Sequence, residues 1–212
     1  MNTRSKQFED SPLKANDAKI AEHILEVSTA LYGEGWLLDE GNPAYGISQI
    51  AEVIIHNARN TRNRSLIFVA GNGGSSSNAS HLALHLEDAE YQTVDLISRV
   101  PVLTAYANDY GYEEALIRQA STLKAGDVLF VISGSGNSKN VVSLARHVKL
   151  TEPDVIVLGL LGSDGGDLVN LCDRYVLIRS NDYGVIEDCH SVMIHSLHKI
   201  LMREAGRLIR SA

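Results

Sequence analysis

Five short apolar runs, rich in β-branched residues, mark the chain from residue 65 onward. The runs are continuous and do not alternate with polar residues, which is typical of strands that are buried on both faces of a parallel sheet. Between them lie segments whose apolar residues recur at helical spacing. The predicted strands are 65–70, 93–97, 127–133, 154–160 and 175–180, and the predicted helices of this region are 76–87, 111–123, 137–149, 165–171 and 185–207.

The alternation of strands and helices predicts an α/β fold, a doubly wound, mainly five-stranded parallel sheet that is flanked by helices on both faces. Two more helices are predicted ahead of the first strand, at 15–32 and 47–60. Their apolar faces fit either an internal core or a contact between subunits. We expect residues 1–14 to form a flexible tail and residues 15–212 to form a single domain, whose size suits one core.

Composition and charge narrow the choice of partners. The formal charge of the 212 residues is −7, which disfavours non-specific binding to nucleic acid, so an anionic substrate needs local features to hold it. No apolar run approaches the roughly 20 residues that span a bilayer, and the polar N-terminus lacks the apolar core of a signal peptide. The two cysteines, Cys172 and Cys189, fit no zinc motif. We therefore expect a cytoplasmic protein that has reduced thiols and binds neither nucleic acid nor a membrane.

Two loops combine glycine with hydroxyl side chains directly after a predicted strand. The first strand is followed by GNGGSSSN at 71–78, and the third strand ends in SGSGNS at 133–138. Glycine permits tight turns, and we expect the serines and Asn78 of the first loop to cap the helix that follows. Free N–H groups at a helix N-terminus bind anions, and open parallel sheets bind ligands beyond the carboxyl ends of their strands. The sequence thus indicates two phosphate-binding loops.

Neither loop has the pattern of a nucleotide site. Residues 71–73 supply G-x-G, but Ser76 stands where the third glycine of a dinucleotide fingerprint belongs. Neither loop contains the lysine of a P-loop. A hydroxyl-rich loop without lysine favours a sugar phosphate over a nucleoside triphosphate. A nucleotide-binding or redox domain is therefore the weaker interpretation.

These motifs, in this order, resemble the SIS (sugar isomerase) family, and within it the phosphoheptose isomerases, which convert sedoheptulose 7-phosphate. The resemblance covers residues 15–205 and is strongest at 71–81, 102–119, 126–142 and 186–195. It implies the SIS fold and a homotetramer with active sites at the subunit interfaces. In such a tetramer the helices within residues 15–62 would serve oligomerisation.

The resemblance also implies which residues bind the phosphosugar. In the family the serines of the second loop hold the phosphate, and here these are Ser133, Ser135 and Ser138. Gly134 stands where the family often has threonine, so one hydroxyl is missing from this loop. The full expected set of substrate-binding residues is Asn72, Gly73, Ser75, Asn108, Asp109, Ser133, Gly134, Ser135 and Ser138.

Aldose–ketose isomerisation moves a proton between adjacent carbons through an enediol. It needs a base beside the carbon and a group that polarises the carbonyl, which a metal ion can be. His81 and His85 are four residues apart on a predicted helix and therefore share one face. Glu187 and His195 are eight residues apart, about two turns, on the last predicted helix.

The family places its acid/base and zinc-binding groups at these four positions. His81 and His195 match the family, whereas His85 replaces the usual glutamate and Glu187 replaces the usual glutamine. Three histidines and one glutamate are a chemically complete set of zinc ligands. We therefore expect a Zn²⁺ site formed by His81, His85, Glu187 and His195. We expect the acid/base roles to lie with His85, Glu187 and His195, and which of them is the acid and which the base stays open.

Two further departures from the family concern the sugar. Arg99 stands where the family often has aspartate after the second strand, and Gly184 replaces an aspartate that is expected before the last helix. The expected function is a metal-assisted phosphosugar isomerase that acts on sedoheptulose 7-phosphate or a related heptulose or octulose phosphate. The alternative is a non-catalytic SIS protein that binds a sugar phosphate or a protein partner, since such members keep the phosphate loops and lose acid/base residues.

The remaining histidines receive weaker interpretations. His190 is three residues from Glu187 and is a candidate for the pocket, whereas we expect His198 at an interface or on the surface. Cys189 is close to the cluster in sequence but is not expected to be a nucleophile. Ordinary helix residues are expected at His23, His56 and His147.

Overall fold

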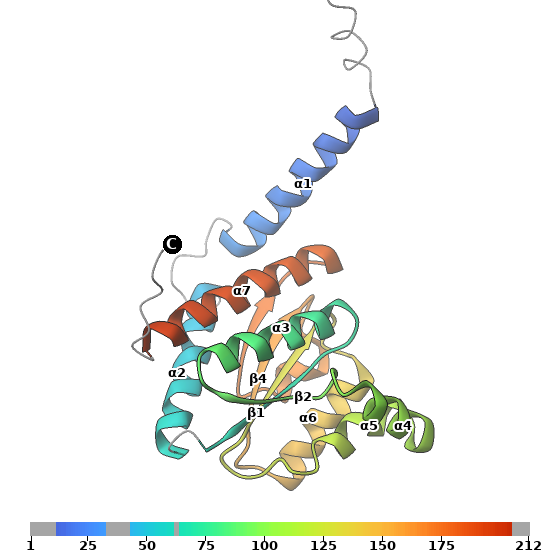
Figure 1. Cartoon of the computed structure of the whole chain (residues 1–212). Coiled ribbons are helices and arrows are strands. Elements are labelled where there is room, and N and C mark those ends of the chain that lie inside the picture. Colours follow the sequence, from blue (N-terminus) through green and yellow to red (C-terminus); the bar gives the residue numbers. More distant parts are fainter. Residues whose placement is uncertain (1–11, 33–42, 62–63, 205–212) are drawn as a thin grey trace, which may run out of the picture.

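A computed structural model describes residues 12–32, 43–61 and 64–204 of the chain (Figure 1). Its elements are, in chain order, α1 (Pro12–Tyr32), α2 (Pro43–Thr61), β1 (Leu66–Ala70), α3 (Gly74–Asp88), β2 (Gln92–Asp95), α4 (Val100–Tyr110), α5 (Tyr112–Gln119), β3 (Val128–Ser133), α6 (Lys139–Thr151), β4 (Ile156–Gly162), the 3₁₀ helix η2 (Gly166–Asn170), β5 (Arg174–Ile178) and α7 (Tyr183–Glu204). None of the described helices is long and apolar enough to cross a membrane.

The strands form one five-stranded parallel sheet in the order β2-β1-β3-β4-β5. This confirms the predicted doubly wound α/β fold, in which the strand order reverses between β1 and β3. Because β1 and β3 are paired, the glycine-rich loops that follow them lie side by side at the carboxyl edge of the sheet. Open parallel sheets bind their ligands at such a reversal point.

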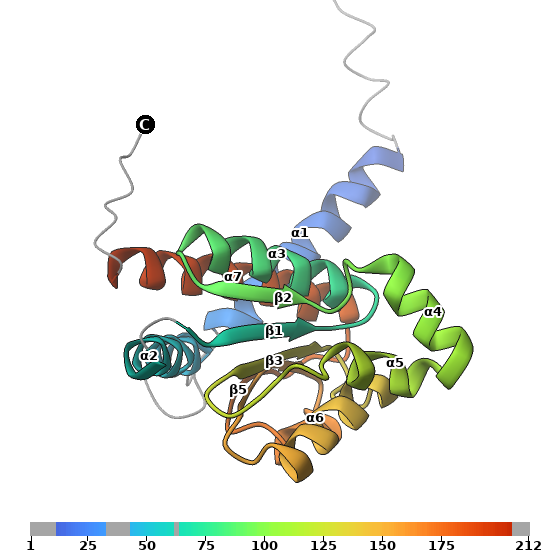
Figure 2. The ribbon, with the colours of Figure 1, turned by 60° about the horizontal axis from the view of Figure 1, so that its bottom comes forward.

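Helices cover both faces of the sheet, and successive strand side chains alternate between the faces. Ile67, Val69 and Phe130 pack on the side of α2, α3 and α7, whereas Phe68 and Val131 pack on the side of α5 and α6. All five side chains are buried, as the continuous apolar runs predict. Figures 1 and 2 show α3 and α7 lying side by side on the first of these faces.

The structure differs from the sequence prediction at three places. Helix α4 was not among the predicted helices, and none of its residues is buried. The helix predicted at 165–171 is a 3₁₀ helix, η2, that follows two glycines with positive φ, 83° at Gly165 and 50° at Gly166. Helix α1 begins at Pro12, so residues 12–14, expected in the tail, are helical. Residues 1–11 and the end of the last predicted helix, 205–207, lie outside the described residues.

Helix α1 leans out from the rest of the molecule (Figure 1). Its end is anchored, because Leu31 is buried in the core that α7 shares, and His23 Nε2 lies 2.8 Å from Asp188 Oδ2 on α7. The side chains of Ile20, Ile24 and Leu25 are each more than half exposed. The helix therefore presents an apolar surface that the described part of the chain leaves uncovered.

Candidate active site

The first glycine-rich loop turns directly into α3. Gly73 precedes the helix with a φ of 55°, which glycine adopts without strain, and no described side chain caps this end. The expectation that the serines and Asn78 cap α3 was wrong, because the turn at Gly73 starts the helix ahead of them and residues 75–78 lie within it. The first N–H groups of α3 therefore receive no side-chain acceptor from the described residues and can meet an anion.

The second loop is shaped by its own hydroxyl groups. Ser133 Oγ accepts a hydrogen bond from the N–H of Gly136 at 3.1 Å and lies 3.4 Å from Ser138 Oγ. Ser135 Oγ accepts a hydrogen bond from the N–H of Asn137 at 3.1 Å. Ser138 occupies the position before α6, but no described side chain hydrogen-bonds to that helix end. The N-terminus of α6 is therefore also without a side-chain acceptor among the described residues and can bind an anion.

Asn72 connects the two loops. Its side-chain carbonyl accepts hydrogen bonds from the hydroxyl of Tyr112 at 2.9 Å and from Asn140 Nδ2 at 3.0 Å. Its own Nδ2 donates to Asn140 Oδ1 at 2.7 Å. Expected only as a substrate-binding residue, Asn72 thus also fixes the first loop against α5 and α6. Tyr112 and Asn140 were missed, because they are 40 and 68 residues from Asn72 and no local pattern reports such a contact.

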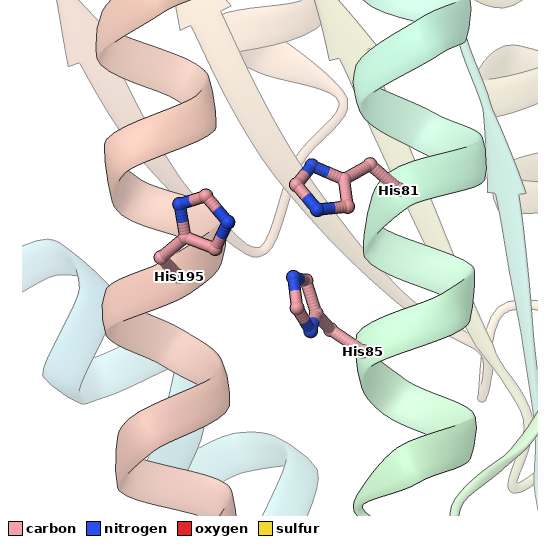
Figure 3. Close-up of side chains that lie close together, drawn as sticks. All are labelled: His81, His85 and His195. Atoms are coloured by element: carbon pink, nitrogen blue, oxygen red, sulfur yellow. The ribbon is translucent and has the colours of Figure 1, made fainter. Parts of the chain in front are cut away.

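Three histidines meet between α3 and α7 (Figure 3). His81, His85 and His195 each offer a ring nitrogen, and these nitrogens all lie within 4.8 Å of one another. The ring centroids are 4.5 Å apart for His81 and His85, 4.9 Å for His81 and His195, and 5.1 Å for His85 and His195. The four-residue spacing puts the first two on one face of α3, and the packing of α7 beside that face supplies the third.

The environment of the two α3 histidines favours neutral imidazole. Burial, followed by the neighbouring His195, lowers the pKa of His81. Burial, with His198, His81 and His195 beside it, lowers the pKa of His85 to about 4. His85 Nε2 is also buried without a hydrogen-bond partner among the described residues. Neutral imidazole is the form that binds a metal, and zinc accepts three histidine ligands, so the cluster fits a zinc ion.

Glu187 does not join the three histidines. It lies two turns ahead of His195 on α7, and eight residues of α-helix rise about 12 Å. Its carboxylate lies against Gly74 at the start of α3, in the space that a β-carbon at Gly74 would need. Its backbone carbonyl accepts a 3.0 Å hydrogen bond from Asn78 Nδ2, which ties α7 to α3. The structure thus brings three of the four expected ligands together and places the Glu187 carboxylate apart from them, and a zinc site at these positions stays a prediction.

Two further histidines of α7 lie close to His195 in sequence. The ring of His198 packs on His85, with centroids 4.4 Å apart, and its Nε2 lies 2.7 Å from Asp88 Oδ2. His198 therefore extends the histidine cluster and is not fully exposed, and its expected position at an interface stays a prediction. His190 is fully buried, its Nε2 lies 3.1 Å from the carbonyl oxygen of Leu161, and burial lowers its pKa to about 4. His190 is thus a core residue and not part of a pocket.

Asn108 and Asp109 lie on the last turn of α4, where both are exposed. Their side chains are joined to each other, with Asn108 Nδ2 donating to Asp109 Oδ1 at 3.0 Å. Arg99 precedes α4 and is exposed as well. Helix α4 stands beyond the sheet (Figure 2), and no hydrogen bond or ion pair among the described residues joins these three side chains to the two loops.

Known proteins are similar to this chain in both sequence and structure. The sequence profile of the SIS domain matches residues 42–159. The phosphoheptose isomerase of Helicobacter hepaticus is 37% identical over 167 residues, which are 76% of this chain and 83% of that protein. The phosphoheptose isomerase of Helicobacter pylori is 41% identical over 142 residues, 64% of this chain and 73% of that protein. The structure of phosphoheptose isomerase from Neisseria gonorrhoeae matches with a TM-score of 0.78 at 29% identity, covering 91% of this chain and 100% of that chain.

The profile match takes in both glycine-rich loops and the two histidines of α3, so it covers the features from which the site is built. It extends over more than half of the chain, and the relatives are matched over most of their own length. This chain belongs to the SIS domain family, and its relatives within that family are phosphoheptose isomerases.

Proposed function

We propose that this protein is an aldose–ketose isomerase that acts on sedoheptulose 7-phosphate, or on a related heptulose or octulose phosphate, through an enediol. The observation that carries the proposal is the convergence of an open helix N-terminus, a carboxylate and three imidazoles on neighbouring elements. The first suits a phosphate group, and the others suit proton transfer and carbonyl polarisation. The relatives named above are isomerases of this class.

The phosphate binds to the second loop in this proposal. The start of α3 already has an anion beside it, the carboxylate of Glu187 against Gly74. A phosphate at the same helix end would be repelled by that carboxylate. The start of α6 has the hydroxyl groups of Ser135 and Ser138 instead. We therefore assign the phosphate to residues 133–138 and the sugar to the neighbouring first loop, with Gly73 and Ser75 among its contacts.

His81, His85 and His195 hold the metal in this proposal, with zinc as the ion. When bound, zinc supplies Lewis-acid polarisation of the carbonyl of the open-chain sugar. The burial of His85 Nε2 shields that nitrogen from water. His85 and His195, expected to share the acid/base roles, would thus serve as metal ligands.

Glu187 moves the proton in this proposal. A carboxylate can take a proton from one carbon and return it to the adjacent carbon, as the enediol route requires. The carboxylate of Glu187 lies against Gly74, where the loop that receives the sugar turns into the helix that carries His81 and His85. Because it is not one of the three clustered ligands, proton transfer and metal binding use different groups.

We extend the proposal to a homotetramer with active sites at the subunit interfaces. The first support is the apolar surface of α1, formed by Ile20, Ile24 and Leu25. The second is that His195, a residue of the site, is exposed on α7, the helix on which α1 packs. Adjoining exposed apolar side chains mark association surfaces. Light scattering should give a smaller species for Ile24→Glu than for the wild type, and an unchanged mass would contradict this role of α1.

We also place the protein in the cytoplasm. Cys172 and Cys189 are free thiols, and burial raises their pKa values to about 12 and about 11. Such thiols are unreactive and compatible with a reducing compartment.

The test is the turnover of sedoheptulose 7-phosphate by the purified protein, as isolated, after chelation, and after zinc is restored. We expect chelation to abolish turnover, zinc to restore it, and elemental analysis to find about one zinc per chain. His195→Ala should lose both zinc and turnover, whereas His147→Ala, at an exposed position of α6, should lose neither. Binding without turnover in the presence of zinc would support the non-catalytic alternative, and absence of binding would reject the phosphosugar assignment.

A further inference from the structure

The ring of Tyr183 packs directly against the backbone of Gly134. A β-carbon built on Gly134 would lie 2.8 Å from both Cδ1 and Cε1 of the Tyr183 ring. The ring therefore fills the volume that any side chain at position 134 would take. Gly134 is the buried second residue of the second loop, between Ser133 and Ser135. An aromatic ring from the last helix thus stands where the loop itself has no side chain.

The start of α7 sets the position of this ring. Asp182 Oδ1 accepts hydrogen bonds from the N–H groups of Gly184 at 2.7 Å and Val185 at 3.2 Å, which is the pattern of a helix N-cap. The N–H of Ile186 donates to the backbone carbonyl of Asp182 at 3.1 Å and closes the first turn. Tyr183 is therefore the first residue of a capped helix, and its backbone is held beside the loop.

The hydroxyl group of Tyr183 has no partner in the described part of the chain, and the residue is 59% exposed. Cε1 is bonded to the carbon that bears the hydroxyl, so a ring that rests on Gly134 keeps the hydroxyl near the loop. The loop's own hydroxyl groups are partly engaged, since Ser133 Oγ and Ser138 Oγ lie 3.4 Å apart and Ser135 Oγ accepts from a backbone N–H. A phosphate bound there would therefore find an additional, unengaged donor.

We propose that Tyr183 is a further substrate-binding residue, whose hydroxyl donates a hydrogen bond to the phosphate group held by residues 133–138. The inference rests on the proposed function, because it requires a phosphate at this loop. Glycine at position 134 admits the ring, and the ring brings a hydroxyl from α7 to a place where the loop has none. A phenol that donates to an anionic phosphate oxygen forms a charge-assisted hydrogen bond, which is stronger than a neutral one.

The test uses Tyr183→Phe, which removes only the hydroxyl, with inorganic phosphate as the probe in calorimetry and sedoheptulose 7-phosphate in kinetics. We expect the phosphate Kd and the KM to rise about tenfold, while kcat and the melting temperature stay unchanged. Tyr175→Phe is the matched control, because Tyr175 is an exposed tyrosine at the start of β5, at the opposite edge of the sheet. This control should bind phosphate as the wild type does.

A second variant tests the pairing of the two residues. Gly134→Ala adds a methyl group that displaces the ring without adding a hydroxyl, so it should weaken phosphate binding as much as Tyr183→Phe does. The double variant should bind no more weakly than either single one, since both changes remove the same contact. Wild-type affinity in Tyr183→Phe, or additive losses in the double variant, would overturn the inference alone. A wild-type protein that binds neither phosphate nor phosphosugar would overturn the proposed function itself.

Discussion

Alanine at position 74 would put a methyl group where the carboxylate of Glu187 lies. A β-carbon built there comes more than 1 Å inside the ordinary contact limit of 3.4 Å from both carboxylate oxygens. The carboxylate is the end of a flexible side chain, so it withdraws by at least that distance while α3 stays in place. Displacing a catalytic group by about 1 Å can cost about 100-fold in rate. We therefore expect Gly74→Ala to lower kcat about 100-fold.

The stability of this variant should not fall. Gly74 does not have a positive φ angle, so alanine fits its backbone conformation. Residue 74 also lies in α3, and alanine is favoured over glycine in a helix by about 0.5–1 kcal/mol. Urea denaturation should give a free energy of unfolding equal to or above that of the wild type. A large loss of rate without a loss of stability would separate a displaced catalytic group from a damaged fold.

The assay compares initial rates at saturating sedoheptulose 7-phosphate among matched variants. Gly46→Ala on α2 is the control, because its β-carbon would first meet the side chain of Val176, at 2.9 Å, away from both loops. That control should keep the wild-type kcat. Glu187→Gln should lose as much rate as Gly74→Ala, and the double variant no more than either. A Gly74→Ala protein with wild-type kcat would refute the assignment of proton transfer to Glu187.

Three further predictions address other parts of the structure. The pKa of buried His190 is lowered to about 4, so between about pH 6.5 and pH 4 the unfolded chain binds a proton that the folded protein does not. The free energy of unfolding should therefore fall by up to about 3 kcal/mol as the pH drops through this range. Urea titrations should show a smaller fall for His190→Gln than for the wild type, and equal falls would contradict the prediction. Asp182→Ala removes the N-cap of α7 and should cost about 1 kcal/mol of unfolding free energy, with no loss being the contrary result. Gly136→Ala adds a methyl group against the carbonyl oxygen of Gly165 at a φ of 65°, so calorimetry should find phosphate binding lost, and retained binding would show that the loop tolerates another shape.

The sequence was most informative about the strands. Buried parallel strands appear as continuous apolar runs, and Phe68 and Phe130, which lie within two such runs, are fully buried on opposite faces of the sheet. Helix α4 gives a weaker signal, because none of its residues is fully buried and Leu103 is its one hydrophobic side chain that packs, partly buried, against the core.

The site was predictable only where local geometry decides it. The contact between His81 and His85 follows from their four-residue spacing on one helix. The position of Glu187 relative to α3 does not follow from its spacing to His195. That spacing determines which face of α7 carries the two residues, but not which residues of α3 lie opposite them. The contact of Tyr183 with Gly134 joins elements far apart in the chain, so it depends on the packing of the whole fold.

The two N-terminal helices dock onto the last parts of the chain to be synthesised. Helix α2 packs on β5 and α7, and α1 packs on α7. At about 5–20 residues per second, a ribosome needs on the order of ten seconds to proceed from the end of α2 to the start of α7. During that interval the apolar faces of both helices have emerged, while the surface that buries them has not been made. Neighbouring chains on one polysome display the same faces at the same time, so chaperone binding and subunit pairing both have access to these helices before the domain is complete.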